Sequence, residues 1–379
     1  MRVYLDNAAS TRMSDKAIEA MIEAMRDVYG NASSGHGMGA AARGEIEKAR
    51  DMIGDCLGVE SSRIVFTSGA TEANNMALHH YALEGERIGK RHIVVSAIEH
   101  PSVMECCLHL KYCKGFEISI VRPNEEGVVC GKDVEREIRS DTCVVCVMAV
   151  NNEVGSIQPI ADIQRSCKEK GVPLHCDATQ AAGHGFRISK KSEGSFSLSA
   201  HKFHGPKGVG VLVLPKTSPF GFHDLMYGGS QEHYHRPGTE NVAGIVGAAV
   251  SLVEACKNED VGIFRDQLYH GLRDRVGGVL LNGNILTSTP NILNVSFEGV
   301  QGDVLVSMLS DLYGVYCSTG SACCSGERKP SSILKAMGFS DERSLGAVRF
   351  SFSRYTTEKE IDFTISAVQD CVSKLRGLK

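Results

Sequence analysis

The sequence predicts an α/β protein built on a mostly parallel sheet with flanking helices, together with a smaller α+β unit. Short apolar runs alternate with helical stretches between residues 63 and 215, a pattern typical of parallel sheets. The pattern of apolar and polar residues changes after residue 260, where a long amphipathic stretch precedes further short strands. The chain has 379 residues, 42% of them hydrophobic, so it is long enough to bury a large core.

The strands are predicted from runs rich in Val, Ile and Phe, each followed by small or polar residues. The first of these runs is "RIVFTS" and the last is "GVLVLP". They occupy residues 63–68, 92–97, 116–121, 143–150, 172–177, 195–200 and 210–215.

Helices are predicted between these strands and in the last third of the chain. The stretch 242–256 is apolar, but it is too short and too rich in Gly and Ala to span a membrane, so it predicts a buried helix. The other predicted helices are 71–85, 160–171, 261–278, 302–313 and 358–379, and two further predicted strands are 291–299 and 347–357. We expect residues 14–259 to form the large domain, and residues 1–13 and 260–379 to form the small domain.

Charge and cysteine content exclude several classes of protein. The formal net charge is −4 and no long basic block occurs, so neither a nucleic acid nor an anionic membrane is expected as a partner. The first ten residues, "MRVYLDNAAS", contain no apolar signal segment, which predicts a cytoplasmic protein. The 14 cysteines are therefore expected to be thiols.

The spacing "CVVC" at 143–146 matches a redox or metal motif, but it lies in an apolar run. Side chains three apart on a strand are expected on opposite faces, so Cys143 and Cys146 would not chelate one ion. Buried cysteine acting as a small hydrophobic residue is the favoured interpretation here and at Cys106 and Cys107.

Residues with polar or reactive side chains follow the carboxyl ends of the predicted strands. In open α/β sheets, ligands bind at this edge. Gly69, Ala70 and Thr71 open a helix after one strand, which favours phosphate binding, although Thr is also a common helix cap. His100 ends the turn after the next strand. Asn151 and Asn152 follow another strand, and Asp177 and Gln180 follow the run 172–177.

Ser199, His201 and Lys202 stand together after the strand 195–200. A lysine at the end of a buried strand can be nucleophilic, because burial lowers its pKa, or it can simply extend to solvent. The phosphate-binding helix start, Asp177, His100 and Lys202 converge on one edge. This set matches pyridoxal phosphate, which needs a Schiff-base lysine and a carboxylate for its ring nitrogen.

A loop of small residues, "YCSTGSACCSGERKP" at 316–330, places Cys317, Cys323 and Cys324 close in sequence. Taken alone, such a cysteine is a nucleophile, a metal ligand, a disulfide partner or a bystander. A disulfide between Cys323 and Cys324 is disfavoured because adjacent Cα atoms lie only ~3.8 Å apart.

The order of motifs resembles the group I cysteine desulfurases, pyridoxal-phosphate enzymes of the fold-type I aminotransferase superfamily that include the NifS and IscS proteins. The resemblance runs end to end and rests on these blocks: "YLDNAAST", "SGATEANN", "EHPSV", "NNEVG", "DATQ", "SAHKFHGPKGVG", "GGSQEHYHRPGTENV", "STGSACCSG" and "RFSFSRYT". It implies a fold-type I structure in which the large domain binds the cofactor and the small domain carries the cysteine loop.

The resemblance also implies a role for each matching residue. Lys202 would form the Schiff base and later move protons, and Cys323 would be the catalytic cysteine. His100 would also be catalytic, because it would stack on the cofactor ring and help with proton transfer. Arg349 would bind the substrate carboxylate, and Asn152 would contact cofactor or substrate. The implied cofactor contacts are Ala70, Thr71, His100, Asn152, Asp177, Gln180, Ser199, His201, Lys202 and, from the second subunit of a homodimer, Thr239.

The implied reaction converts L-cysteine to L-alanine and leaves a persulfide on Cys323, for transfer to an acceptor in iron–sulfur cluster assembly, tRNA thiolation or both. A selenocysteine lyase or another pyridoxal-phosphate enzyme is the first alternative. The second is a sulfur or metal carrier without catalysis that uses Cys317, Cys323 and Cys324. No resident metal is expected of the enzyme.

The sequence departs from the family pattern at several positions. Ala32 stands where proline is common, and Ser230 stands where a third glycine is usual. His233 and His235 are atypical in the segment that reaches the second subunit, and Cys324 follows the expected nucleophile. None of these changes removes a chemical group that the implied mechanism needs.

Overall fold

The computed structural model describes residues 1–189, 192–216, 225–257, 261–320 and 329–377. Its largest feature is a seven-stranded sheet of order β2-β8-β7-β6-β5-β3-β4. Six of its strands run in one direction, and β8 runs antiparallel to both of its neighbours, β2 and β7. The strands are β2 (Ile64–Thr67), β3 (His92–Ser96), β4 (Glu117–Val121), β5 (Thr142–Cys146), β6 (Leu174–Asp177), β7 (Ser195–Ser199) and β8 (Gly210–Val213).

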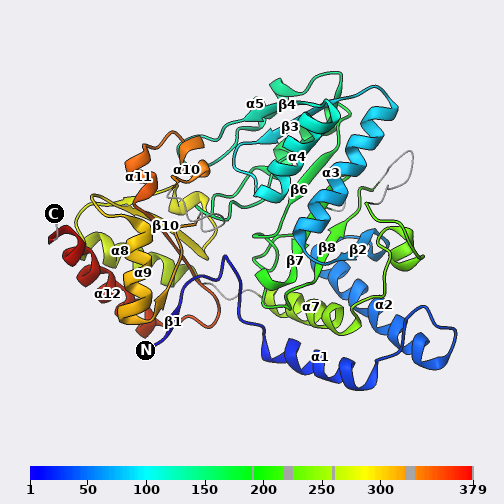
Figure 1. Cartoon of the computed structure of the whole chain (residues 1–379), viewed down its shortest axis with the longest axis horizontal. Coiled ribbons are helices and arrows are strands. Elements are labelled where there is room, and N and C mark those ends of the chain that lie inside the picture. The colour runs from blue at the N-terminus through cyan, green and yellow to red at the C-terminus, as the bar shows by residue number, and fades with distance from the viewer. Residues whose placement is uncertain (190–191, 217–224, 258–260, 321–328, 378–379) are drawn as a thin grey trace.

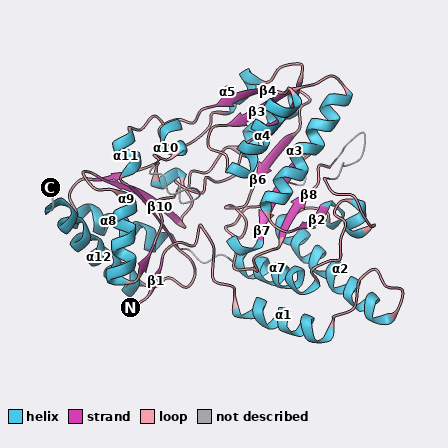
Figure 2. Cartoon of the chain, in the orientation of Figure 1, coloured by secondary structure: helices cyan, strands magenta, loops and turns pink. Residues whose placement is uncertain are grey.

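Helices cover both faces of this sheet (Figures 1 and 2). One face packs against α3 (Ala70–Arg87) and α4 (Pro101–Lys114). The other packs against α2 (Gly37–Leu57) and α7 (Val242–Ala255) at one end, and against α5 (Gly131–Glu137) and α6 (Ile160–Glu169) at the other. The helix α1 (Asp15–Asp27) lies against α7, outside the sheet. We call this part of the chain the large-sheet unit.

The last third of the chain forms a second core around the antiparallel sheet β12-β10-β9, which we call the small-sheet unit. Figure 1 shows it beside the large-sheet unit. Its elements are α8 (Gly262–Arg275), β9 (Val279–Leu281), β10 (Ile292–Phe297), α9 (Gly302–Met308), a π-helical turn Leu309–Tyr313, β11 (Val315–Tyr316), α10 (Ser332–Ala336), α11 (Asp341–Leu345), β12 (Ala347–Ser351) and α12 (Glu358–Gly377).

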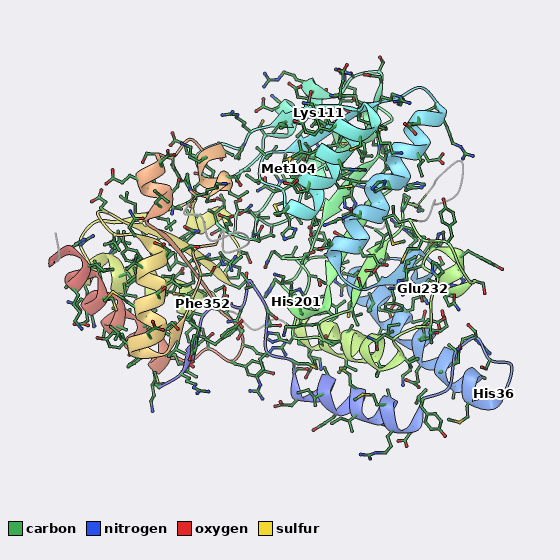
Figure 3. The ribbon with its side chains drawn as sticks, in the orientation of Figure 1. His36, Met104, Lys111, His201, Glu232 and Phe352 are labelled. Atoms are coloured by element: carbon green, nitrogen blue, oxygen red, sulfur yellow. The ribbon has the colours of Figure 1, made fainter. Side chains whose placement is uncertain are left out.

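The first residues of the chain connect the two units. The strand β1 (Val3–Tyr4) pairs in parallel with β11 in the small-sheet unit. Further along, the Thr11 side chain donates to the carbonyl of His201, just after β7, at 2.9 Å. Figure 3 shows Phe352, in the small-sheet unit, and His201 on either side of this N-terminal segment. The segment therefore lies where the edges of both sheets meet.

The structure confirms the predicted fold class, with its mostly parallel sheet, helices on both faces and a smaller α+β unit. All the predicted strands between residues 63 and 215 are present, although β5 ends at Cys146, earlier than expected. The domain boundaries at 13/14 and 259/260 stay a prediction, and the second falls outside the described residues. Within the described part of the chain, no helix is both long and apolar enough to cross a membrane.

The expectation that Cys143 and Cys146 face opposite sides of the sheet was wrong. The register of β3 with β5 shifts between His92 and Ile93, so one residue of β5 has no partner and the alternation is interrupted there. Both thiols consequently pack in the core beneath α3 and α4. Burial raises the pKa of Cys143 to about 12, so this thiol is inert.

Candidate active site

A cavity of about 570 Å³ opens at the carboxyl ends of the parallel strands, where the two units meet. Every described residue that the sequence implied as a cofactor or substrate contact lines it, with the exception of Thr239. These residues are Ala70, Thr71, His100, Asn152, Asp177, Gln180, Ser199, His201, Lys202 and Arg349. The large sheet therefore brings the segments at the ends of five strands to one place, and β12 of the small-sheet unit adds Arg349.

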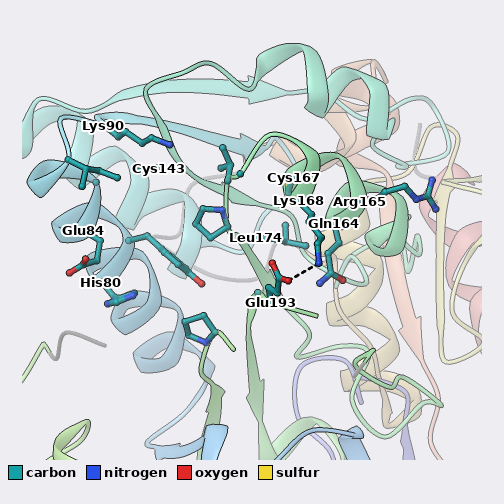
Figure 4. A pocket seen from close by; sticks show the side chains of 18 of the residues that line it. His80, Glu84, Lys90, Cys143, Gln164, Arg165, Cys167, Lys168, Leu174 and Glu193 are labelled. Carbon is teal, nitrogen blue, oxygen red and sulfur yellow. Dashed lines mark hydrogen bonds and ion pairs between the residues drawn. The ribbon is translucent and has the colours of Figure 1, made fainter. Parts of the chain in front are cut away.

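A second cavity, of about 720 Å³, lies toward the opposite ends of the same strands (Figure 4). Its described lining includes Tyr81 of α3 and Leu174 of β6, and the Lys168 ammonium pairs with Glu193 at 2.8 Å at its border. None of the implied cofactor contacts is among these described lining residues. We therefore assign the smaller cavity as the candidate active site.

One end of the candidate site is the N-terminus of α3. Its first-turn backbone N–H groups have no partner within the helix, and the helix dipole is positive there, which favours a phosphate group. Ser68, Gly69, Ala70 and Thr71 line the cavity at this end. Gly210 of β8 lies directly against Gly69, because a Cβ built on Gly210 would come within 2.4 Å of the Gly69 Cα. Glycine at 210 is thus required for this close approach.

Lys202 lies in the turn after β7, at the centre of the candidate site. Its ammonium donates to the carbonyl oxygens of Ala8 and Ala9 at 2.6 and 2.9 Å. The amide of Gln180 also donates to the Ala8 carbonyl, at 2.8 Å. Residues of the N-terminal segment thereby position the amine that the sequence assigned to the Schiff base.

Asp177, the last residue of β6, is buried, and both of its carboxylate oxygens accept hydrogen bonds. The backbone N–H of Thr179 donates to one oxygen at 3.0 Å, and the side-chain amide of Asn74 donates to the other at 2.9 Å. These two hydrogen bonds fix the orientation of the carboxylate. Asp177 is therefore prepared to face a cationic nitrogen.

His100 caps the start of α4. Its Nδ1 accepts the backbone N–H of Ser102 at 3.1 Å and lies 2.8 Å from the Ser102 hydroxyl. Burial lowers the pKa of His100 and Lys202 lowers it further, against the opposing effect of Asp177. The ring is consequently neutral at neutral pH, and with Nδ1 accepting, its proton is on Nε2.

His201 and Ser199 complete the phosphate end. Burial lowers the pKa of His201 to about 4, and the neighbouring cations Lys202 and Lys207 add to the effect. Ser199 is buried at the end of β7, opposite Gly210 of β8. Both side chains line the cavity beside the start of α3 and offer neutral hydrogen-bonding groups there.

Arg349 reaches the cavity from the small-sheet unit, at the middle of β12. Its guanidinium donates to the Asn152 carbonyl at 2.7 Å and pairs with Asp6 at 2.8 Å. Its Nε is buried and, among the described residues, has no hydrogen-bond partner. Asn151, by contrast, binds the backbone of Ile98 and does not line the site.

The cysteine loop begins at the rim of the site. Ser318 exchanges backbone hydrogen bonds with Arg349 at 2.6 and 3.2 Å, and Gly320 lines the cavity. Cys323 and Cys324 lie outside the described residues. Cys317 is buried in the core of the small-sheet unit, and burial raises the pKa of its thiol. Its position favours a packing role over the ligand role that the sequence left open.

Thr239 is exposed and lies apart from the described lining of the cavity. The segment before it is held by Glu232, which is buried and accepts from Arg50 and from the backbone N–H of Phe66. Glu232 and His233 have positive φ angles of 48° and 54°, so this segment has an unusual, sharply folded backbone.

The site residues that sequence reasoning missed include Asp6, Ala8, Ala9 and Ser102. It also missed Asn74, which lies just beneath the site. A signal for Asn74 exists in the strands that it contacts. "LHCD" and "SFSLS" alternate polar and apolar residues although they are buried on both faces, which indicates a buried polar partner on one side.

Comparison with known proteins identifies close relatives. Residues 3–363 match the family model described as aminotransferase class-V. A cysteine desulfurase IscS of Dictyoglomus turgidum is 39% identical over 99% of this chain and 96% of that protein. A cysteine desulfurase of Sinorhizobium fredii is 41% identical over 99% of this chain and 97% of its own length.

Solved structures of similar proteins also superpose on this chain over most of its length. A NifS-like protein superposes with a TM-score of 0.91 at 39% identity and covers 99% of this chain and 100% of its own. The structure of SspA in complex with cysteine superposes with a TM-score of 0.81 at 31% identity, over 94% of this chain and 100% of that one.

Proposed function

The chain belongs to the aminotransferase class-V family and, within it, to the cysteine desulfurases, and from this premise we propose that it converts L-cysteine to L-alanine and passes the sulfur to an acceptor protein. The observation that carries the proposal is the single cavity in which the Lys202 amine, the Asp177 carboxylate, the His100 ring and the N-terminus of α3 meet.

The cavity fits pyridoxal phosphate by the chemistry of its groups. Thr71, Ser199, His201 and the backbone at the start of α3 would hold the phosphate. Asp177 would face the ring nitrogen, and Gln180 the ring hydroxyl. When bound, pyridoxal phosphate withdraws electrons from an attached amino acid and thereby weakens the bonds near its α-carbon.

Lys202 would hold the cofactor through its amine and afterwards carry a proton between substrate and solvent. The Ala8 and Ala9 carbonyls orient the amine through hydrogen bonds of 2.6 and 2.9 Å. His100 is neutral, so its ring would pack on the cofactor without adding positive charge beside Lys202. Its Nε2 would provide a second place to hold a proton.

Arg349 would bind the substrate carboxylate, which a guanidinium does through two parallel hydrogen bonds. Its orphaned Nε is a buried donor beside the cavity, and a carboxylate would satisfy it. The Asn152 side chain, which lines the same wall, would contact the substrate or the cofactor.

Cys323 would take the sulfur. Its thiolate would attack the sulfur atom of the substrate, a new S–S bond would form on Cys323, the carbon–sulfur bond would break, and the carbon would gain a proton to give L-alanine. Cys323 follows Gly320 of the cavity rim by three residues, and three residues span at most roughly 11 Å. The length of chain between Gly320 and Cys323 therefore permits this nucleophile to reach the site.

The persulfide would pass to an acceptor protein, either an iron–sulfur scaffold or a tRNA-thiolation carrier. We also propose a homodimer. Helix α1 exposes an apolar stripe made of Ile18, Ile22 and Met25, one helical turn apart, which is a surface suited to a second copy. Thr239 would then reach the phosphate of the second subunit.

We place the enzyme in the cytoplasm. The cysteines that the structure describes are all free thiols, which is in keeping with a reducing compartment. The exposed Cys113 is one of them.

The proposal is tested by incubating the purified protein with L-cysteine and a thiol reductant and measuring alanine and sulfide. Wild type is expected to form both in equal amounts. Lys202→Ala is expected to lose the yellow colour of bound cofactor and all activity, and Cys323→Ser almost all activity. Cys324→Ser and the control Cys113→Ser are expected to keep most of it.

Two results would contradict the proposal. A stoichiometric metal without pyridoxal phosphate in the purified protein would favour a metal carrier. If Cys324→Ser is inactive while Cys323→Ser is active, the nucleophile is Cys324. A parallel assay with L-selenocysteine decides between a desulfurase and a selenocysteine lyase, and we expect L-cysteine to be turned over in its own right.

A further inference from the structure

We propose that Asn74 is a positioning residue that fixes both Asp177 and His100. A buried chain of hydrogen bonds runs from Tyr81 to Asp177, with every donor directed toward Asp177, and this chain holds Asn74 in place. The inference rests on the proposed function, because Asp177 and His100 act there on the cofactor. It assigns a role to residues that lie behind the cavity wall.

The Asn74 side chain is fully buried on α3, one turn after Thr71, and uses both of its polar atoms. Its Nδ2 donates to the Asp177 carboxylate at 2.9 Å and to the Ser102 hydroxyl at 2.8 Å. Its Oδ1 lies 2.9 Å from His175 Nε2 and accepts from the Ser197 hydroxyl. The amide thus joins α3 to the strands β6 and β7 and to the start of α4.

The contacts fix the orientation of the amide. A carboxylate accepts hydrogen bonds and does not donate them, so the NH₂ group of Asn74 must face Asp177. Its carbonyl must then accept from His175, which places the proton of that ring on Nε2. His175 Nδ1 is left as an acceptor for the Ser195 hydroxyl, 2.9 Å away. Burial lowers the pKa of His175 to about 4, which keeps the ring neutral.

On the same face of the sheet, the chain continues toward the opposite ends of the strands. The Tyr81 hydroxyl donates to Ser195 at 3.1 Å, and Tyr81 lines the second cavity. From Tyr81 through Ser195, His175 and Asn74, every member donates its hydrogen toward Asp177. Hydrogen bonds aligned in this way polarise one another. The last donor in the series, the Asn74 amide, therefore meets the carboxylate more strongly than an isolated amide would.

The alternation of residues along the strands explains why these groups meet. His175 and Asp177 are two apart on β6, and Ser195, Ser197 and Ser199 are two apart on β7, so each set shares one face of the sheet. That face packs against α3. A polar stripe consequently runs beneath the helix, from the second cavity to the candidate active site.

A second arm reaches His100. The Ser102 hydroxyl oxygen accepts from Asn74, so its own hydrogen is available for His100 Nδ1 at 2.8 Å. With Nδ1 occupied as an acceptor, His100 keeps its proton on Nε2. Through one arm, Asn74 positions the Asp177 carboxylate, which would face the ring nitrogen of the cofactor. Through the other arm, it positions the Ser102 hydroxyl, which binds His100 Nδ1 together with the Ser102 backbone N–H and so orients the His100 ring.

The test uses Asn74→Ala and Ser102→Ala in the holoenzyme, with Asn75→Ala as the matched control. Asn75 is the next residue of α3 and binds mainly the backbone of its own helix. The readouts are the dissociation constant for pyridoxal phosphate, the ¹⁵N chemical shift of the ring nitrogen in labelled cofactor, and kcat and KM for L-cysteine. Circular dichroism verifies folding.

We expect Asn74→Ala to weaken cofactor binding by about tenfold to a hundredfold, the effect of losing one hydrogen bond to a charged group. We also expect it to shift the ¹⁵N signal toward the unprotonated ring. Ser102→Ala is expected to lower kcat about tenfold and to leave the ¹⁵N signal and the cofactor affinity unchanged, because it cuts only the His100 arm. Asn75→Ala is expected to match wild type in all three readouts.

A folded Asn74→Ala variant with wild-type affinity and ¹⁵N shift overturns the inference. If Asn74→Ala does not fold, Ser102→Ala decides: an unchanged kcat overturns the inference, and a lowered kcat with an unchanged ¹⁵N signal supports it. These failures are distinct from failure of the proposed function, in which the wild type itself would bind no pyridoxal phosphate or release no alanine.

Discussion

The Arg50 guanidinium and the Glu232 carboxylate form a doubly hydrogen-bonded ion pair, at 2.7 and 2.8 Å, in the interior of the large-sheet unit. Both side chains are only 3% exposed. The pair ties α2 to the folded segment that leads to Thr239, and Glu232 also accepts the Phe66 backbone N–H at 2.7 Å. One carboxylate thus fixes the backbone of three separate parts of the chain.

Replacing Glu232 with Ala is expected to destabilise the protein by roughly 3–5 kcal/mol, because the buried Arg50 charge loses its buried partner and keeps only the half-exposed Glu47 carboxylate. Urea unfolding measures the loss. The matched control is Asp162→Asn, which breaks the exposed pair with Arg165 and is expected to cost at most about 1 kcal/mol. Equal effects of the two substitutions would show that the buried pair contributes no more than a surface contact.

Asp6 and Arg349 should depend on each other in substrate binding. Asp6→Asn is expected to raise KM for L-cysteine roughly tenfold with little change in kcat, because Arg349 loses a charged hydrogen-bond partner that orients it. In an Arg349→Lys background, the Asp6→Asn change is expected to have a much smaller effect. Steady-state kinetics of the two single variants and the double variant measure this coupling, and strictly additive effects would refute it.

Acid should weaken the fold partly through His175. Its pKa in the folded protein is about 4, below the ordinary value of 6.5, so the unfolded chain binds the extra proton first as the pH falls. The stabilisation is present above pH 6.5 and is lost between pH 6.5 and 4. Between pH 7.5 and 5.0, the unfolding free energy of the His175→Gln variant is expected to fall by roughly 2 kcal/mol less than that of wild type. Urea titrations at both pH values measure the difference, and parallel decreases for wild type and variant would contradict the assignment.

Cys256 is expected to react with iodoacetamide as a thiolate near neutral pH. A hydrogen bond from the Cys56 thiol lowers the pKa of Cys256 to about 7, with a further contribution from Arg187. Cys56→Ala should slow alkylation of Cys256 at pH 7 by about tenfold, because the thiolate loses its donor. Mass spectrometry of tryptic peptides follows the rate, with the exposed Cys113 as internal control. An unchanged Cys256 rate would show that Cys56 does not act on it.

The sequence was sufficient for the strands of the large sheet and for most of the site. Both depend on local patterns: β-branched apolar runs form strands, and parallel strands bring the residues after them to one edge. Asp177 and Lys202, for example, were found from their positions after buried strands. The antiparallel direction of β8 and the order of the strands depend on long-range pairing, which no local pattern contains.

What the sequence did not predict was set by contacts between distant residues. Nothing in "LDNAAS" indicates that the Ala8 carbonyl will accept from Lys202, about halfway along the chain. Asn74 lies within a helix that was correctly predicted, but its role follows only from the strands packed against it. The bulge that places Cys143 beside Cys146 is likewise a property of strand pairing.

The N-terminal segment has a consequence for the timing of events in the site. Asp6 holds Arg349 and, two residues later, Ala8 holds Lys202. Two peptide units span at most roughly 7 Å, so a displacement at one of these contacts is felt at the other. A carboxylate that binds Arg349 and shifts its guanidinium would move Asp6 with it, and the Ala8 carbonyl that restrains the lysine would shift as well. Binding of the substrate carboxylate at Arg349 and release of the Lys202 amine from the Ala8 carbonyl would then be coupled.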